Sequence, residues 1–116
     1  MEKYILARSV YDVKEYLKGA KVISFDFETS PDERYRDEAM AAIDAHKSHI
    51  VGVSFSVEEG TGIYAPIAHK DEEFNLDMIE VLREFSESSA VKIAHNLAFE
   101  AMFLYSNSIL TLQHTE

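Results

Sequence analysis

The stretch KVISFDFETS places Asp26 and Glu28 inside a run that is otherwise largely apolar. Side chains alternate between the two faces of a strand, so the two acids share one face and Ile23, Phe25 and Phe27 share the other. Strands this apolar are usually buried, and a buried carboxylate is costly unless something neutralises its charge. The stretch therefore predicts a strand with an apolar face and two carboxylates that need a partner.

Asp26 and Glu28 stand about 6.6 Å apart along such a strand, so their charges repel. A divalent cation such as Mg²⁺ relieves this repulsion, because hard ions take carboxylate oxygens as ligands. The same pattern is also typical of a half-exposed strand with a solvated acidic face. The two acids alone leave both interpretations open.

The rest of the pattern predicts an α/β fold in a single domain over residues 1–116, with a mixed sheet flanked by helices. The short turn EEGTG joins two apolar runs, which implies an antiparallel hairpin. A polar connector that is partly helical is expected over residues 31–48. The expected strands are 21–28, 50–57, 63–68 and 91–95, and the expected helices follow Ser9, span 74–88 and follow Asn96.

The charge balance sets limits on partners. The 116 residues include 11 Lys and Arg against 21 Asp and Glu, a formal net charge of −10. Proteins that hold nucleic acid through their own surface normally carry a basic patch, and none is evident here. The chain has no Cys, and no apolar run approaches the ~20 residues of a membrane span, which predicts a cytoplasmic protein without membrane contact.

A second acid stands in an unusual place. Glu100 is the sole charged residue between Asn96 and Tyr105, in the apolar run LAFEAMFLY that follows a short strand. It lies one turn inside the expected helix, where the helix dipole favours a negative charge. The alternative is that Glu100 marks the solvent side of that helix. His69 and His95 match no zinc-ligand spacing.

Together, FDFET on an early strand and HNLAFEAMFL at a strand–helix junction resemble the first two motifs of the DEDD (DnaQ-like) 3′–5′ exonucleases. With the intervening IYAPIAH, the chain is most similar to the proofreading domain of family A DNA polymerases. The resemblance runs from about Lys21 to the end. It implies a ribonuclease H-like fold in which antiparallel early strands are followed by parallel ones.

The resemblance also implies site residues. Asp26 and Glu28 match the motif acids that bind two divalent cations, Mg²⁺ or Mn²⁺. Glu100 stands where the second motif usually has Asp, and one extra methylene still lets it reach a metal directly or through water. The substrate-binding positions implied are Thr29, Asn96 and Phe99, although Phe99 is also compatible with an ordinary core position.

The third motif of the family, Tyr-x3-Asp or His-x4-Asp, has no match. Sixteen residues follow Glu100, none of them is Asp, and Glu116 is the sole acid among them. The resemblance thus implies the N-terminal portion of an exonuclease domain that is inactive by itself. Its expected partners are the 3′ end of single-stranded DNA and a polymerase domain in the same polypeptide.

Three other functions remain open. One is a catalytically inactive exonuclease-like scaffold beside a polymerase. Another is an acidic interaction module that binds a basic partner through its −10 surface. The third is a nuclease that trims RNA with the same chemistry, because the two motifs do not distinguish DNA from RNA.

Overall fold

The fold is a five-stranded mixed sheet with helices, seen here in a computed structural model that describes residues 3–67, 75–94, 96–106, 109 and 115. This confirms the predicted α/β class. In chain order the elements are β1 (Lys3–Leu6), α1 (Val10–Leu17), β2 (Val22–Pro31), the 3₁₀ turns η1 (Glu33–Tyr35) and η2 (Ala41–Ile43), β3 (Ser48–Ser56), β4 (Thr61–Pro66), α2 (Asn75–Glu87), β5 (Val91–Ala94) and α3 (Leu97–Ser106).

The acid-bearing strand β2 lies near the middle of the sheet, whose order is β1-β4-β3-β2-β5. The early strands β2, β3 and β4 pair antiparallel, whereas β5 joins β2 in parallel. A parallel connection needs a crossover, and α2 supplies it between β4 and β5. The antiparallel-then-parallel order is the one predicted from the sequence.

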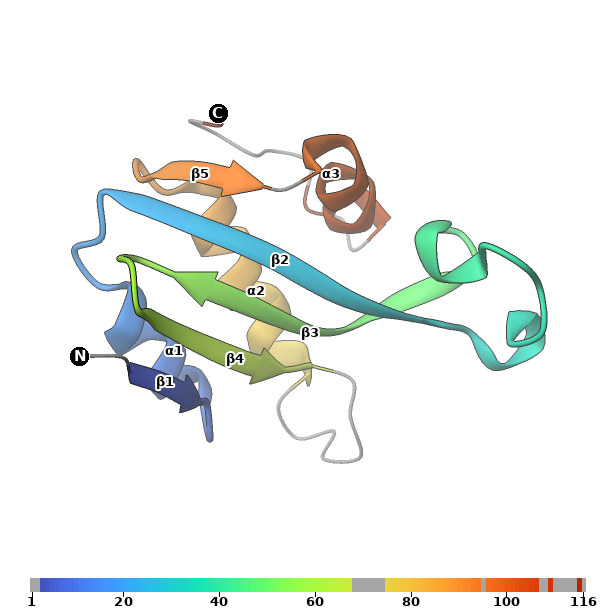
Figure 1. The fold of residues 1–116 in the computed structure, drawn as a ribbon, viewed down its shortest axis with the longest axis horizontal. Coiled ribbons are helices and arrows are strands. Elements are labelled where there is room, and N and C mark those ends of the chain that lie inside the picture. Colours follow the sequence, from blue (N-terminus) through green and yellow to red (C-terminus); the bar gives the residue numbers. More distant parts are fainter. Residues whose placement is uncertain (1–2, 68–74, 95, 107–108, 110–114, 116) are drawn as a thin grey trace.

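The strands β2 and β3 continue past the rest of the sheet as a two-stranded arm that carries η1 and η2 (Figure 1). The predicted strand ended at Glu28, but pairing continues from Thr29 to Pro31 against the start of β3. The polar connector is helical only in two 3₁₀ turns. The polar composition predicted the connector, and cross-strand pairing extends β2 and β3 into the two-stranded arm.

Both α1 and α2 lie on one face of the sheet, as Figure 1 shows. The hydroxyl of Ser9 accepts a hydrogen bond from the backbone N–H of Asp12 at 3.4 Å, which caps α1 as its sequence predicts. No helix in the described ranges is long and apolar enough to cross a membrane.

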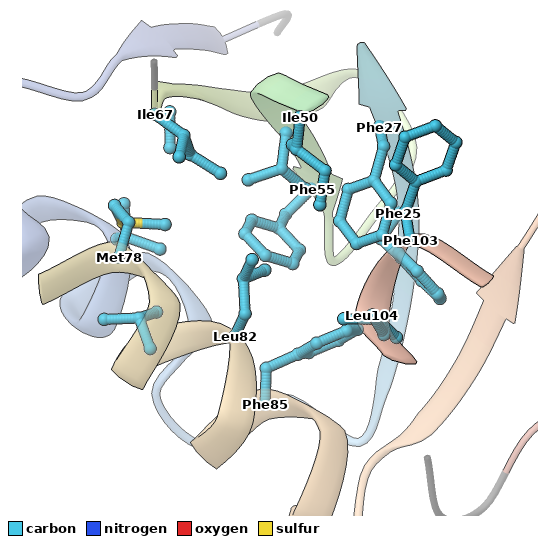
Figure 2. Packing of buried hydrophobic residues seen from close by; sticks show 14 of the residues in the cluster. Phe25, Phe27, Ile50, Phe55, Ile67, Met78, Leu82, Phe85, Phe103 and Leu104 are labelled. Atoms are coloured by element: carbon cyan, nitrogen blue, oxygen red, sulfur yellow. The ribbon is translucent and has the colours of Figure 1, made fainter. Parts of the chain in front are cut away.

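The core lies between the sheet and the helices (Figure 2). Phe85 of α2 packs edge-to-face against Phe25 of β2 and Phe55 of β3, with ring centroids 4.9 and 5.0 Å apart. Phe103 and Leu104 of α3 close the same cluster and are fully buried. The apolar face of β2 is therefore the inner face, and Asp26 and Glu28 project from the opposite, open face.

We expect Phe85→Ala to destabilise the protein by about 3–5 kcal/mol, because it removes the ring that joins two strands to α2. Tyr11→Ala, at a side chain that is 66% exposed, is the matched control and should cost less than about 1 kcal/mol. Urea denaturation measures both values, and Phe85→Leu serves if the alanine variant does not fold. Equal decreases in the free energy of unfolding for the variants at positions 85 and 11 would contradict the assignment of Phe85 to the core.

Candidate metal-binding carboxylate site

The site begins where β5 stops. Pairing of β5 with β2 ends at Phe25 and Ala94, so no strand of the described part of the chain pairs with this edge of β2 beyond Phe25. The first turns of α3 fill this place, and Oε2 of Glu100 accepts a hydrogen bond from the backbone N–H of Phe27 at 3.3 Å. Glu100 thus supplies an acceptor to β2 where the sheet has none, and its side chain is only 1% exposed.

Asn96 fixes the start of α3. Its Oδ1 accepts a hydrogen bond from the N–H of Phe99 at 3.2 Å, and its carbonyl accepts one from the N–H of Glu100 at 3.0 Å. An Asn at this position satisfies N–H groups that have no acceptor inside the helix. The cap therefore sets where Glu100 lies along β2.

Glu100 contacts Asp26 as well as β2. The pKa of Glu100 is raised from 4.5 to about 7, chiefly by burial, and the hydrogen bond from Phe27 opposes this rise. The negative charge of Asp26 and a hydrogen bond with its carboxylate are smaller contributions to the same rise. Two carboxyl groups in contact favour a shared proton, which a divalent cation can replace.

The structure brings Asp26 and Glu100 together but does not complete the predicted group of three acids. Among the described residues, no set of three or more Asp, Glu, His or Cys side chains is close enough to hold a metal ion. Glu28 is exposed on the same face of β2 as Asp26 and lies opposite Gly52 of β3. The alternative in which Glu100 marks the solvent side of its helix is wrong, because that side chain is buried.

The contact of Glu28 is one that the sequence analysis missed. Tyr64 of β4 has a raised pKa because of burial, the negative charge of Glu28 and a hydrogen bond to Glu28. Gly52 lies between them on β3, and its lack of a side chain leaves room for the Tyr64 ring. A Gly inside the strand IVGVSF was the available signal, because such a glycine often marks a close approach by another group.

The remaining predicted positions make contacts within the protein. The hydroxyl of Thr29 donates to the carbonyl of Ala42 at 2.6 Å, which ties β2 to η2 just after a register shift between Glu28 and Thr29. Phe99 is half-buried and packs edge-to-face on Phe103 at 4.9 Å. His69 and His95 lie outside the described residues.

Beside Asp26, the open face of the sheet is hollowed by a depression of about 610 Å³. Its floor is formed by side chains of all five strands. Those relevant to the site are Tyr4, Ser24, Asp26, Ser54, Tyr64 and Ile93. Asp26 is therefore open to solvent and to a ligand on this face, whereas Glu100 is covered.

A metal would find two of its ligands in place. Asp26 and Glu100 offer hard oxygen donors from two elements, and a divalent cation between the two groups would offset the repulsion of their negative charges once both are ionised. Glu28 stands about 6.6 Å further along the strand. The carboxylate oxygens of Asp26 and Glu100 would suit Mg²⁺ or Mn²⁺, which prefer oxygen ligands.

Comparison of the sequence with known proteins gives a partial match to a DNA polymerase. No protein-family model matches the chain. A stretch of 53 residues, 46% of the chain, is 42% identical to DNA polymerase I of Pseudomonas aeruginosa and covers 5% of that protein.

Comparison of the fold gives nucleases. The chain is similar to the Nibbler EXO domain of Aedes aegypti (TM-score 0.61, 14% identity, 95% of this chain and 47% of that one). It is similar to NrnC of Brucella melitensis bound to pGG (TM-score 0.60, 15% identity, 98% of this chain and 47% of that one). It is also similar to NrnC with bound Mg²⁺ (TM-score 0.56, 16% identity, 98% of this chain and 47% of that one). RNase D of Trypanosoma brucei follows (0.58, 12%, 85% and 32%).

These comparisons confirm the predicted ribonuclease H-like fold, which the chain shares with these nucleases. The chain spans less than half the length of each of these nucleases, and the matched stretch spans a twentieth of the polymerase. The structural matches cover between 85% and 98% of this chain.

The pKa of Glu100 predicts a pH dependence of stability. The unfolded chain releases this proton near pH 4.5 and the folded protein holds it to about pH 7. The proton therefore stabilises the fold fully below pH 4.5, and this contribution is lost as the pH rises through 7. We expect the loss to reach at most about 3 kcal/mol, from ~1.4 kcal/mol for each pKa unit.

Glu100→Gln carries no titratable proton, so its stability should lack this contribution. The difference in the free energy of unfolding between wild type and Glu100→Gln should fall between pH 4.5 and 7.5, as measured by urea denaturation. Glu84→Gln, on an exposed position of α2, is the matched control and should track the wild type. A difference that stays constant with pH would refute the buried protonated carboxyl.

Proposed function

We propose that this chain is the N-terminal, metal-binding portion of a 3′–5′ exonuclease domain that acts on the 3′ end of single-stranded DNA. We further propose that the domain belongs to a polypeptide with a DNA polymerase domain, where it removes misincorporated nucleotides. The nuclease fold and the stretch similar to DNA polymerase I support this assignment. The observation that carries it is the contact between the Asp26 and Glu100 carboxyl groups on the open face.

In the proposed mechanism, Asp26 would be the principal ligand of the divalent cations, and Glu28 and Glu100 would be further carboxylate ligands. When bound, divalent cations supply a nucleophilic water and stabilise the leaving oxygen of an in-line phosphodiester displacement. Asp26 reaches the open face from a central strand, and Glu100 is held rigidly by β2 and by its helix cap. Bound cations would also reduce the electrostatic repulsion between a phosphate group and the chain, whose net charge is −10.

We propose that three further residues serve substrate binding. Asn96 and Phe99 would contact the substrate, and Thr29 would position the arm beside it. Asn96 is exposed at the start of α3, next to the carboxylate pair, and can meet a nucleotide there. Phe99 offers a half-buried ring on the same helix, suited to stacking on an unpaired base. Thr29 joins β2 to η2 and thereby sets the arm beside Glu28.

Hydrolysis needs the third motif, which these 116 residues lack. That motif supplies a fourth acid and a Tyr or His near the attacking water in the exonucleases that the sequence resembles. We therefore propose that the chain alone binds a cation weakly and that cleavage requires the polypeptide that carries all three motifs.

An inactive exonuclease-like scaffold is the second candidate. The observation in its favour is that Asp26, Glu28 and Glu100 form no group of three acids among the described residues. A scaffold of this kind would keep the fold and the carboxylate pair but would show no response to a divalent cation.

Metal binding gives the first test. Because a cation binds the folded site alone, saturating Mn²⁺ should stabilise the chain, by ~2.7 kcal/mol at a hundredfold excess over Kd. The melting temperature should therefore rise by several degrees. Asp26→Asn should abolish the rise, whereas Asp77→Asn, at an exposed position of α2, should retain it. A full rise in Asp26→Asn would place the cation elsewhere, and no rise in the wild type would favour the scaffold.

Activity gives the second test. A polypeptide with this chain and the third motif should shorten a 5′-labelled single-stranded DNA stepwise in the presence of Mg²⁺, and should release labelled mononucleotide from a 3′-labelled one. Asp26→Ala should lower the rate by at least on the order of 10³, because both cations depend on this ligand. Glu100→Ala should cost as much if Glu100 ligates directly and less if it acts through water.

The same assay separates the alternatives. The 116-residue chain alone should cleave little, so strong cleavage by it would refute the need for the third motif. Preferential shortening of an RNA oligonucleotide would replace proofreading by RNA trimming. Absence of cleavage by the three-motif polypeptide would leave the scaffold as the function.

A further inference from the structure

The phenol of Tyr64 lies across a neighbouring strand. Tyr64 pairs with Ser54 of β3, and Ser54 in turn pairs with Asp26 of β2. The ring leaves this row and passes over Gly52, where a methyl group would overlap its Oη and Cζ and lie 2.8 Å from its Cε1. Carbon atoms in ordinary contact are ~3.5 Å or more apart, so only a glycine at position 52 permits this path.

The path ends at Glu28. Gly52 is the direct partner of Glu28 in the antiparallel ladder between β2 and β3. A ring that crosses Gly52 therefore brings its hydroxyl to the Glu28 carboxylate on the open face, and the hydrogen bond between the two groups is consistent with this geometry. A phenol donates one hydrogen bond, so the Tyr64 hydroxyl engages one oxygen of the Glu28 carboxylate.

We propose that Tyr64 is a positioning residue that fixes the Glu28 carboxylate beside Asp26, and that Gly52 provides the space for it. This inference rests on the proposed function, in which Glu28 is a cation ligand. Glu28 is exposed and its side chain has several rotatable bonds, so an unrestrained carboxylate would lose conformational entropy on binding an ion. A hydrogen-bond partner that orients a ligand in advance raises metal affinity for this reason.

The first experiment is free of metal. The carboxyl ¹³C signal of Glu28, assigned by its absence in Glu28→Gln, should shift in Tyr64→Phe and in Gly52→Ala. Tyr11→Phe removes an exposed hydroxyl from α1 and should leave the signal in place. No shift in either variant would overturn the inference, whether or not the chain binds metal.

The second experiment measures Mn²⁺ affinity by titration calorimetry, counting the binding that Asp26→Asn abolishes. Tyr64→Phe should weaken it about tenfold, the lower end for loss of a partner that orients a metal ligand. Gly52→Ala should weaken it similarly by displacing the phenol. The double variant should lose no more than the larger single loss, because both changes break one contact.

The outcomes separate the inference from the function on which it rests. Melting temperatures of Tyr64→Phe and Tyr11→Phe in the absence of metal should agree, since neither change empties the core. Unchanged Mn²⁺ affinity in Tyr64→Phe would overturn the inference while the proposed metal site stands. Higher affinity would also overturn it, because Tyr64 would then hold Glu28 away from the ion. A wild type without Mn²⁺ binding would refute the site itself.

Discussion

The buried carboxyl of Glu100 is the contact on which the site depends. Its Oε2 takes the hydrogen bond that β2 would otherwise give to a neighbouring strand, and its other contact is the carboxylate of Asp26. This arrangement links three features: the strand β5, which is only four residues long, a helix capped by Asn96, and an acid one turn into that helix. Lengthening β5 would close the gap that Glu100 fills.

The two acids of β2 have different surroundings, although they share one face of the strand. Asp26 meets Glu100 from α3, whereas Glu28 meets Tyr64 from β4. The site is thus assembled from both sides of β2. The helix α3 contributes from the side of β5, and the Tyr64 phenol contributes from the side of β3. The divided arrangement explains why no three acids gather among the described residues, and a cation at the pair would have Glu28 close by.

Much of this could be read from the sequence, and the rest depended on tertiary contacts. Alternation in VISFDF predicted which face of β2 is buried, and the run after Asn96 predicted a helix with one acid. Burial of Glu100 could not be predicted, because Glu usually lies at the surface. It is tolerated here because the backbone N–H of Phe27 needs a hydrogen-bond acceptor and Glu100 supplies it. The contact between Tyr64 and Glu28 joins β4 to β2 across β3, and the sequence indicated it only through the glycine at position 52.

The claim at the centre of this account is that Asp26 and Glu100 form a cation site on the open face of the sheet. Anomalous scattering from crystals grown with Mn²⁺ tests it directly, because the ion itself is located. The account predicts an anomalous peak with carboxylate oxygens of Asp26 and Glu100 among its ligands at ~2.1 Å, and no such peak in Asp26→Asn crystals. A peak remote from both side chains, or the carboxyl pair still in direct contact at saturating Mn²⁺, would contradict it.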